Sequence, residues 1–180
     1  HALAWKVAQS AAVETVYVAP GNAGTALEPK VKNIPLRADD VKGLRDFAEQ
    51  HRVALTIVGP EAALVTGIVD CFTAAGLRCF GPSQAAARLE GSKAFCKDFL
   101  HRHGIPTAAY RTFTDLAEAE AYLQSQPAPL VIKADGLAAG KGVILAQSVD
   151  EAQAAVRSML AGDAFGAAGR RIVIEEFLRG

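Results

Sequence analysis

Residues 130–145 read Leu130-Val-Ile-Lys-Ala-Asp-Gly-Leu-Ala-Ala-Gly-Lys-Gly-Val-Ile-Leu145. Two short apolar runs, 130–132 and 143–145, flank a loop, a pattern typical of a β-hairpin. Between Lys133 and Val143 this loop has three glycines and one lysine. Glycines let backbone N–H groups approach a ligand closely, and a lysine adds positive charge, so the loop could bind phosphate. It is not a Walker A loop, because Gly142 stands where that motif has Ser or Thr.

Two further features favour phosphate binding by this loop. Lys133 ends an apolar strand, where a charge is costly without a partner, and both Lys133 and Lys141 could face one polyphosphate. Downstream, Glu175-Glu-Phe-Leu178 closes another apolar strand and could offer backbone groups to the edge of a nucleotide base. The alternatives are a solvated lysine in a turn, an edge-strand lysine that prevents aggregation, and a strand that runs out into solvent.

The segments around the loop predict a small α+β unit. A helix is expected at 93–103, after Gly91-Ser92, followed by a strand at 110–113. Thr114 is the expected N-cap of a helix that runs to Ser125, and Ser148 that of a helix at 149–160. A last strand is expected at 171–178.

The pattern before residue 90 is different, because short strands alternate there with helices. We expect a helix in 1–10, strands at 14–18, 33–36, 54–58 and 77–80, and helices at 41–51 and 61–75. Such alternation predicts right-handed βαβ units and a parallel sheet. The predicted fold class is therefore α/β: a Rossmann-like domain with a parallel sheet over residues 1–91, then a partial α+β domain over residues 92–180.

Composition excludes several classes of protein. The 180 residues carry 19 basic and 19 acidic side chains, so no positive excess drives binding to nucleic acid. The apolar runs are too short to span a bilayer, and 51% of the residues are hydrophobic, which is too many for a disordered chain. The three cysteines form no C-x-x-C pair and are typical of reduced thiols in the cytoplasm.

Long stretches of the chain resemble the phosphoribosylamine–glycine ligases, also called glycinamide ribonucleotide synthetases, which are ATP-grasp enzymes. The resemblance covers the whole chain. Its motifs in the first half are Ala19-Pro-Gly-Asn-Ala-Gly-Thr25, Ile57-Val-Gly-Pro-Glu61 and Phe80-Gly-Pro82; those in the second half are 91–103, 131–142 and Ile172-Val-Ile-Glu-Glu-Phe-Leu178. The resemblance implies a pre-ATP-grasp domain followed by the first part of an ATP-grasp domain.

The same resemblance implies which residues bind ATP. The loop would fold over the triphosphate with Lys141 as its catalytic lysine, Lys93 and Lys133 would contact the nucleotide, and the residues after the last strand would bind adenine. The implied nucleotide-binding residues are Lys93, Lys133, Asp135, Gly136, Gly140, Lys141, Gly142, Glu175, Glu176, Phe177 and Leu178.

Phosphoribosylamine would bind the first domain, at loops that follow the carboxyl ends of parallel strands. The implied residues are Asn22, Gly24, Thr25, Pro60 and Glu61. Glu61 could bind the amine or the ribose hydroxyls of this substrate. Alternatively, its carboxylate only complements the dipole of the helix that it begins.

The implied reaction is the ATP-dependent ligation of glycine to 5-phosphoribosylamine through glycyl phosphate, in purine biosynthesis. The implied cofactor is Mg²⁺ or Mn²⁺ with ATP, held by residues outside this chain, and no metal site is predicted in it. We expect a segment of a longer, monomeric, cytoplasmic protein with no nucleic-acid or membrane partner. We expect the segment alone to be inactive, because motifs of the family at both ends are absent.

Two other functions stay open on the sequence. One is ligation by another ATP-grasp enzyme that joins a carboxylate to an amine, such as a carboxylase acting on a purine precursor. The other is a non-catalytic module that binds a nucleotide. The full sequence of the glycine loop disfavours the first of these, and the second stays open.

Overall fold

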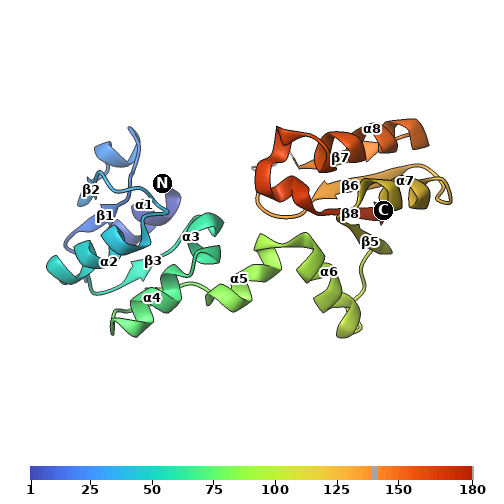
Figure 1. Ribbon diagram of the computed structural model, residues 1–180. Helices are drawn as coiled ribbons and strands as arrows, with labels where there is room; N and C mark the ends of the chain where they lie inside the picture. The colour runs from blue at the N-terminus through green and yellow to red at the C-terminus, as the bar shows by residue number, and fades with distance from the viewer. Residues whose placement is uncertain (139–141, 180) are drawn as a thin grey trace. The chain divides into compact units, whose positions relative to one another are not determined.

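The computed structural model describes residues 1–138 and 142–179. The chain divides into two compact units, residues 1–85 and 86–180, each with its own core (Figure 1). The division falls within helix α5 (Gln84–Gly91), which the sequence analysis did not predict. Within the described residues, no helix is long and apolar enough to cross a membrane.

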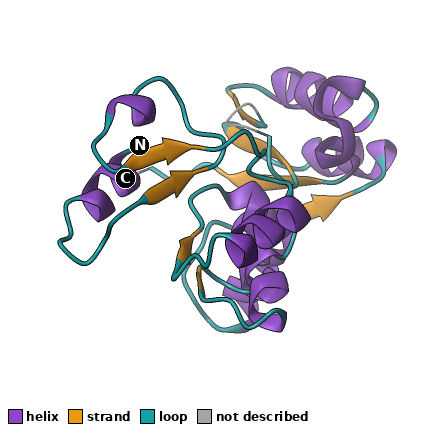
Figure 2. Ribbon diagram, turned by 90° about the vertical axis from the view of Figure 1, so that its left-hand side faces the viewer, coloured by secondary structure: helices purple, strands orange, loops and turns teal. Residues whose placement is uncertain are grey.

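The first unit is α/β with parallel strands, as the alternating pattern predicted. Its elements are α1 (Ala2–Ala8), β1 (Val16–Val18), η1 (Thr25–Leu27), β2 (Val31–Asn33), α2 (Val41–Gln50), β3 (Thr56–Ile57), α3 (Glu61–Val65), α4 (Ile68–Ala74) and β4 (Cys79–Phe80). Strand β1 runs parallel to β2, and β3 parallel to β4 (Figure 2). Each pair forms its own two-stranded sheet, with only two or three residues in each strand.

Helix α2 shows how local sequence starts an element of this unit. The carboxylate of Asp40 accepts a hydrogen bond from the Gly43 N–H at 2.9 Å and so caps the helix, as expected of an aspartate at this position. The helix packs Ala48 into a core formed around Ile68 and Phe72 of α4. Burial of these apolar side chains holds the helices against the short strands.

Two predictions for this unit were wrong in position. The helix expected at 61–75 is two helices, because Gly67 has φ +87° and a left-handed residue ends a right-handed helix. The strand expected at 33–36 is β2, which lies earlier because Val31 is the residue buried against its partner strand. Pro35, which lacks an N–H, follows the strand.

The second unit is an antiparallel sheet with helices. After α5, its elements are α6 (Lys93–Arg102), β5 (Tyr110–Phe113), α7 (Leu116–Leu123), β6 (Leu130–Ala134), β7 (Val143–Ala146), α8 (Val149–Leu160), η2 (Asp163–Arg170) and β8 (Ile172–Glu176). The strand order is β5-β8-β6-β7, and every neighbouring pair is antiparallel. The predicted hairpin of β6 and β7 is confirmed.

The two faces of this sheet have different neighbours. Ile132 of β6 and Ile174 of β8 are fully buried against α7 and α8, in a cluster that includes Leu123 and Met159. Because side chains alternate along a strand, the odd-numbered residues of β6 and β8 point to the opposite face. Helix α6 contacts β8, and Figure 1 shows it on the other side of the sheet from α8.

Two helix caps were predicted in this unit, and one of them is confirmed. The Ser148 hydroxyl caps α8, and the Ser92 hydroxyl caps α6 in the same way, each accepting from the backbone N–H three residues on. The other prediction was wrong: Asp115, not Thr114, caps α7, and its carboxylate accepts from the Glu118 N–H at 2.9 Å. A carboxylate is a strong cap because its charge also complements the helix dipole.

The three cysteines, Cys71, Cys79 and Cys96, are free thiols, and each is partly buried. The prediction that they are unpaired is therefore confirmed. Burial raises the pKa of the Cys79 thiol above its ordinary value.

Candidate functional site

The sheet face toward α6 carries two rows of side chains that cross all four strands. One row is Tyr110, Glu175, Val131 and Leu145; the next is Thr112, Val173, Lys133 and Val143. Each row has one charged side chain at its centre, Glu175 in the first and Lys133 in the second. Each ends in an exposed apolar side chain on β7, where Val143 and Leu145 are 48% and 45% exposed. The face can therefore offer both charge and an apolar surface to one ligand.

A cluster of two lysines and one glutamate lies on this face. The Glu175 carboxylate is nearly buried, and its Oε2 atom lies 2.9 Å from Lys133 Nζ and 3.1 Å from Lys97 Nζ. Its Oε1 atom is buried without a hydrogen-bond partner among the described residues. The cluster carries one net positive charge, which suits an anionic ligand.

Lys97 is the member of this cluster that the sequence analysis missed. Its ammonium group also donates to Thr107 Oγ1 at 2.8 Å and to the Ala108 carbonyl at 3.1 Å. The signal in the sequence is its place three residues after Ala94 on α6, because residues at this spacing share a helix face and Ala94 is buried. A lysine on a buried helix face requires acidic or carbonyl partners.

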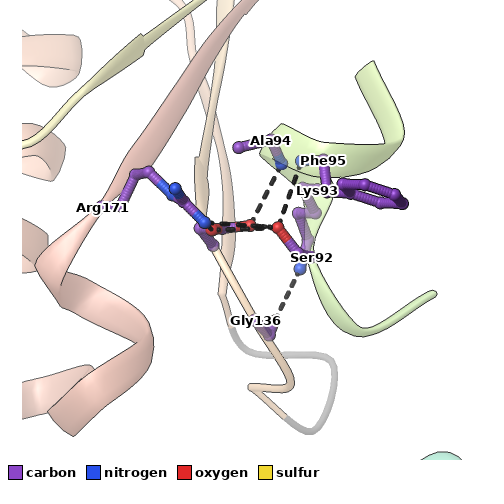
Figure 3. A network of polar contacts seen from close by, with 7 residues as sticks. Ser92, Lys93, Ala94, Phe95, Gly136 and Arg171 are labelled. Carbon is purple, nitrogen blue, oxygen red and sulfur yellow. Dashed lines mark hydrogen bonds and ion pairs between the residues drawn. The ribbon is translucent and has the colours of Figure 1, made fainter. Parts of the chain in front are cut away.

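Asp135, which directly follows β6, is the centre of a second polar cluster, and Figure 3 labels its partners Ser92, Ala94 and Arg171. Its carboxylate accepts from the Ser92 hydroxyl at 3.0 and 3.2 Å, from the Ala94 N–H at 3.1 Å and from Arg171 Nε at 2.6 Å. Burial raises the pKa of this carboxyl, but the bonds from Ala94, Arg171 and Ser92 outweigh burial and leave the pKa below its ordinary value. Asp135 therefore ties α6, β6 and the start of β8 together.

Lys93 lies beside the start of the glycine loop. Its ammonium group donates to the Gly136 carbonyl at 2.8 Å, and Figure 3 shows this contact next to the Asp135 cluster. Gly136 has φ +111°, a conformation that requires glycine. Lys93 thus lies at the start of the loop. The prediction that Lys133 and Lys141 face one polyphosphate is not tested, because Lys141 lies outside the described residues.

The remaining predicted loop residues are only partly described. Gly140 and Lys141 lie outside the described residues. Gly142 is described, and its carbonyl accepts from the Ala134 N–H at 2.8 Å, which continues the pairing of β6 with β7. This hydrogen bond between Ala134 and Gly142 closes the hairpin, and the loop lies between these two residues.

The end of β8 differs from the prediction in length. The strand ends at Glu176, whose side chain accepts from the Ala109 N–H at 2.8 Å, and not at residue 178. Phe177 and Leu178 follow with exposed side chains, 39% and 62% accessible. An apolar, exposed segment beside the Glu175 cluster is compatible with base binding, which stays a prediction.

The loop after β1 in the first unit is held by its own polar side chains. Thr25 is fully buried, and its hydroxyl accepts from the Asn22 N–H at 2.8 Å. The single proton of this hydroxyl has two acceptors within reach, Asn33 Oδ1 at 2.8 Å and the Asn22 carbonyl at 2.9 Å. Asn22 Oδ1 in turn accepts from the Thr25 N–H, and Gly24 lies beside the ring of His1. The Thr25 side chain thus shapes the loop, and its direct contact with a substrate is not supported by this geometry.

Pro60 and Glu61 lie where the sequence placed them, between β3 and α3. Pro60 is the residue before the helix, and Glu61 is exposed in its first turn. No hydrogen bond of the Glu61 side chain to another described residue is present, so its carboxylate is accessible to a ligand. The helix-dipole interpretation fits this position equally well.

The described residues contain no group of three or more His, Cys, Asp or Glu side chains close enough to hold a metal ion. His101 and His103, the one close histidine pair of the sequence, lie exposed at the end of α6. No metal site is assigned on this chain.

Comparison with protein families gives two matches that together cover the chain. The N domain of phosphoribosylglycinamide synthetase matches residues 1–90, and the ATP-grasp (A) domain of the same synthetase matches residues 91–180. The phosphoribosylamine–glycine ligase of Escherichia coli O6:H1 is 67% identical over 180 residues, which is all of this chain and 42% of that protein. The chain therefore spans less than half the length of this relative.

Solved structures agree with this comparison. The crystal structure of phosphoribosylamine–glycine ligase from Thermotoga maritima matches the whole chain with a TM-score of 0.78 and 29% identity, over 41% of its own length. The biotin carboxylase domain of the Hydrogenobacter thermophilus 2-oxoglutarate carboxylase, solved with MgADP, matches 86% of the chain and 36% of its own length, with a TM-score of 0.67 and 18% identity. At that identity, the second likeness concerns the fold alone.

Proposed function

The chain belongs to the phosphoribosylglycinamide synthetase family, and from this we propose that the protein ligates glycine to 5-phosphoribosylamine with ATP, giving glycinamide ribonucleotide, ADP and phosphate. The observation that supports this most is the convergence of residues from distant parts of the chain. Lys133 of β6 and Glu175 of β8 form an ion pair on the sheet face toward α6, and Lys93 of α6 donates to the Gly136 carbonyl at the start of the glycine loop. The proposal places this enzyme in the cytoplasm, as a monomer.

The nucleotide would lie on this face with its phosphates near the two lysines. Lysine ammonium groups stabilise phosphate by charge-assisted hydrogen bonds. Lys93 donates to the Gly136 carbonyl at the start of the loop, and Lys133 donates to the Glu175 carboxylate on the neighbouring strand. Lys141, Gly140 and Gly142 would complete the contacts to the triphosphate.

The base would lie against the apolar end of the same face. Val131 and Leu145 are cross-strand partners in the row that contains Glu175, and Phe177 and Leu178 extend the chain past it. Apolar side chains can cover the faces of a base, while backbone groups after Glu175 bind its edge. Val131 and Leu145 were not predicted from the sequence, because their shared face depends on the register of β6 with β7.

The chemical steps follow from the reactants. A carboxylate oxygen of glycine attacks the γ-phosphorus of ATP, the bond to the β-γ bridging oxygen breaks, and glycyl phosphate and ADP form. The amine of phosphoribosylamine then attacks the acyl carbon, loses a proton, and phosphate leaves. Lysines at the phosphates would stabilise the charge of the transferring group. Mg²⁺ or Mn²⁺, which the family implies, would neutralise further phosphate charge, and we assign its ligands outside this chain.

Phosphoribosylamine would bind the first unit. The Asn22–Thr25 loop follows β1 and Glu61 follows β3, so both lie after the carboxyl ends of parallel strands. Asn22 and Gly24 would contact the substrate through the loop backbone that Thr25 holds in place. Pro60 and Glu61 would contact its amine or ribose hydroxyls.

The test is a ligation assay on the product of the complete reading frame. We expect release of phosphate from ATP only when glycine and freshly made phosphoribosylamine are both present. Lys133→Met should lower kcat/KM for ATP about ten- to a hundredfold, because one charge-assisted contact to phosphate is lost. Lys42→Met, at an exposed position of α2, is the matched control and should leave kcat/KM for ATP unchanged.

Two results would contradict the proposal. Phosphate release that needs neither glycine nor phosphoribosylamine would assign another substrate to the enzyme. ATP binding without turnover under any combination of these substrates would favour a non-catalytic nucleotide-binding module. The 180-residue chain alone, assayed beside it, is expected to bind ATP weakly and not to catalyse ligation.

A further inference from the structure

Glu175 holds two lysines whose surroundings differ. Both ammonium groups contact the same oxygen, Oε2, at 2.9 Å for Lys133 and 3.1 Å for Lys97. The Lys97 side chain is 9% exposed and that of Lys133 is 26% exposed. One carboxylate therefore has a buried counter-ion from α6 and a more accessible one from β6.

The two lysines also differ in how completely their donors are used. An ammonium group has three N–H donors. Those of Lys97 find Glu175, Thr107 and the Ala108 carbonyl. Glu175 is the one hydrogen-bond partner that the described residues give to Lys133. Release of Lys97 would break three contacts in a buried place, whereas release of Lys133 would break one.

We propose that Lys97 is a positioning residue: it is the fixed counter-ion of Glu175, and it allows Lys133 to leave that carboxylate for a phosphate of the bound nucleotide. The inference rests on the proposed function, because it assumes that the nucleotide lies on this face. It adds a role for a residue that would not itself touch the nucleotide.

The reason is the cost of an unpaired buried charge. If Lys133 were the sole counter-ion of Glu175, moving it to a phosphate would leave a nearly buried carboxylate without a positive partner, which is strongly unfavourable. With Lys97 in place, the carboxylate keeps one ion pair throughout. Lys133 can then exchange one charge-assisted hydrogen bond for another at little net cost.

The experiment compares the affinities of ATP and adenosine for the product of the complete reading frame. Adenosine has the base and ribose but no phosphate, so the ratio of the two dissociation constants isolates the contribution of the phosphates. In Lys97→Met, Lys133 should stay with Glu175, and the preference for ATP over adenosine should fall at least about tenfold, as for loss of one charge-assisted contact. Lys133→Met should lower the preference to a similar extent.

A second substitution separates positioning from a general structural role. When Glu175→Gln removes the charge that holds Lys133, Lys97 should no longer matter. The preference for ATP in the double variant Lys97→Met/Glu175→Gln should therefore equal that of Glu175→Gln alone. This comparison can be made even if Lys97→Met alone does not fold, because it uses only Glu175→Gln and the double variant, and both lack the Glu175 carboxylate.

Lys30→Met is the matched control. Lys30 donates to the carbonyls of Ser10 and Val13 in the first unit, and its loss should leave the ratio unchanged. Two results overturn the inference and leave the proposed function intact. One is that Lys97→Met weakens ATP and adenosine binding equally. The other is that Lys97→Met lowers the preference for ATP equally with and without Glu175→Gln. Failure of the unsubstituted protein to bind ATP overturns both.

Discussion

Asp135→Asn should destabilise the second unit far more than its small change in size suggests. The carboxylate accepts from three groups on two other elements: the Ser92 hydroxyl, the Ala94 N–H and Arg171. An asparagine keeps one acceptor oxygen and places an NH₂ donor where the second oxygen was. That donor then faces other donors, since both oxygens of Asp135 are in use.

The size of the effect follows from these contacts. A buried donor left without an acceptor costs about 1–3 kcal/mol. The lost ion pair adds about 0.5–1 kcal/mol, because the Arg171 side chain is 49% exposed and solvent screens its charge. The expected loss of unfolding free energy is about 3 kcal/mol, which for a unit of this size corresponds to a fall in Tm of roughly 12–24 °C.

The assay is thermal unfolding at neutral pH, followed by circular dichroism, with Asp115→Asn as the matched control. Asp115 also accepts a backbone N–H at a helix start, but it caps α7 from an exposed position. Asparagine is as good a cap as aspartate there, so the control should lose only a few tenths of a kcal/mol. If Asp135→Asn costs no more than Asp115→Asn, the carboxylate is not the tie between α6, β6 and β8 that its contacts indicate.

Three further outcomes are expected. The pKa of Asp135 is lowered in the folded protein, so the stability that its carboxylate contributes is fully present above the ordinary carboxyl pKa of 3.8. That stability is lost as pH falls through the lower pKa of the folded state. Tm should therefore depend less on pH in this acidic range in Asp135→Asn than in the unsubstituted protein. Burial and the hydrogen bond to Asp98 raise the pKa of Tyr110 to about 12, so one of the three tyrosines should ionise late in an ultraviolet titration of the folded protein, and Tyr110→Phe should remove that step. Lys141→Ala, in the predicted phosphate loop, should lower kcat/KM for ATP about ten- to a hundredfold in steady-state kinetics, and an unchanged value would mean a solvated turn lysine.

Local signals in the sequence predicted most elements of the second unit. The apolar runs of β6 and β7 flank a loop rich in glycine, and Ser148 marks the start of α8, so each element is specified by residues within a few positions of its ends. The errors arose where two local signals competed. Thr114 and Asp115 are neighbours and both good caps, and it is the Asp115 carboxylate that accepts the Glu118 N–H.

The contacts of the candidate site were less predictable than its residues. Lys133 and Glu175 were both identified, but their ion pair depends on the register of β6 with β8, which no short stretch of sequence encodes. Lys97 was missed because a lysine on a helix is usually solvated. Its burial follows from the placement of α6 against the sheet, which is a property of the whole unit.

The two polar clusters are built from the same three elements, and this explains why both are needed for one site. Helix α6 gives Ser92 to the Asp135 cluster and Lys97 to the Glu175 cluster. Residues 133 and 135 share a face at the end of β6, as do 171 and 175 along β8, because side chains two or four apart in a strand point the same way. The Asp135 cluster fixes where the three elements begin or end, and the Glu175 cluster fixes how they lie beside one another. A lysine can exchange its partner for a phosphate only if the surrounding elements stay in place. Two measurements therefore report on the same arrangement of α6, β6 and β8: the stability lost in Asp135→Asn and the preference for ATP lost in Lys97→Met.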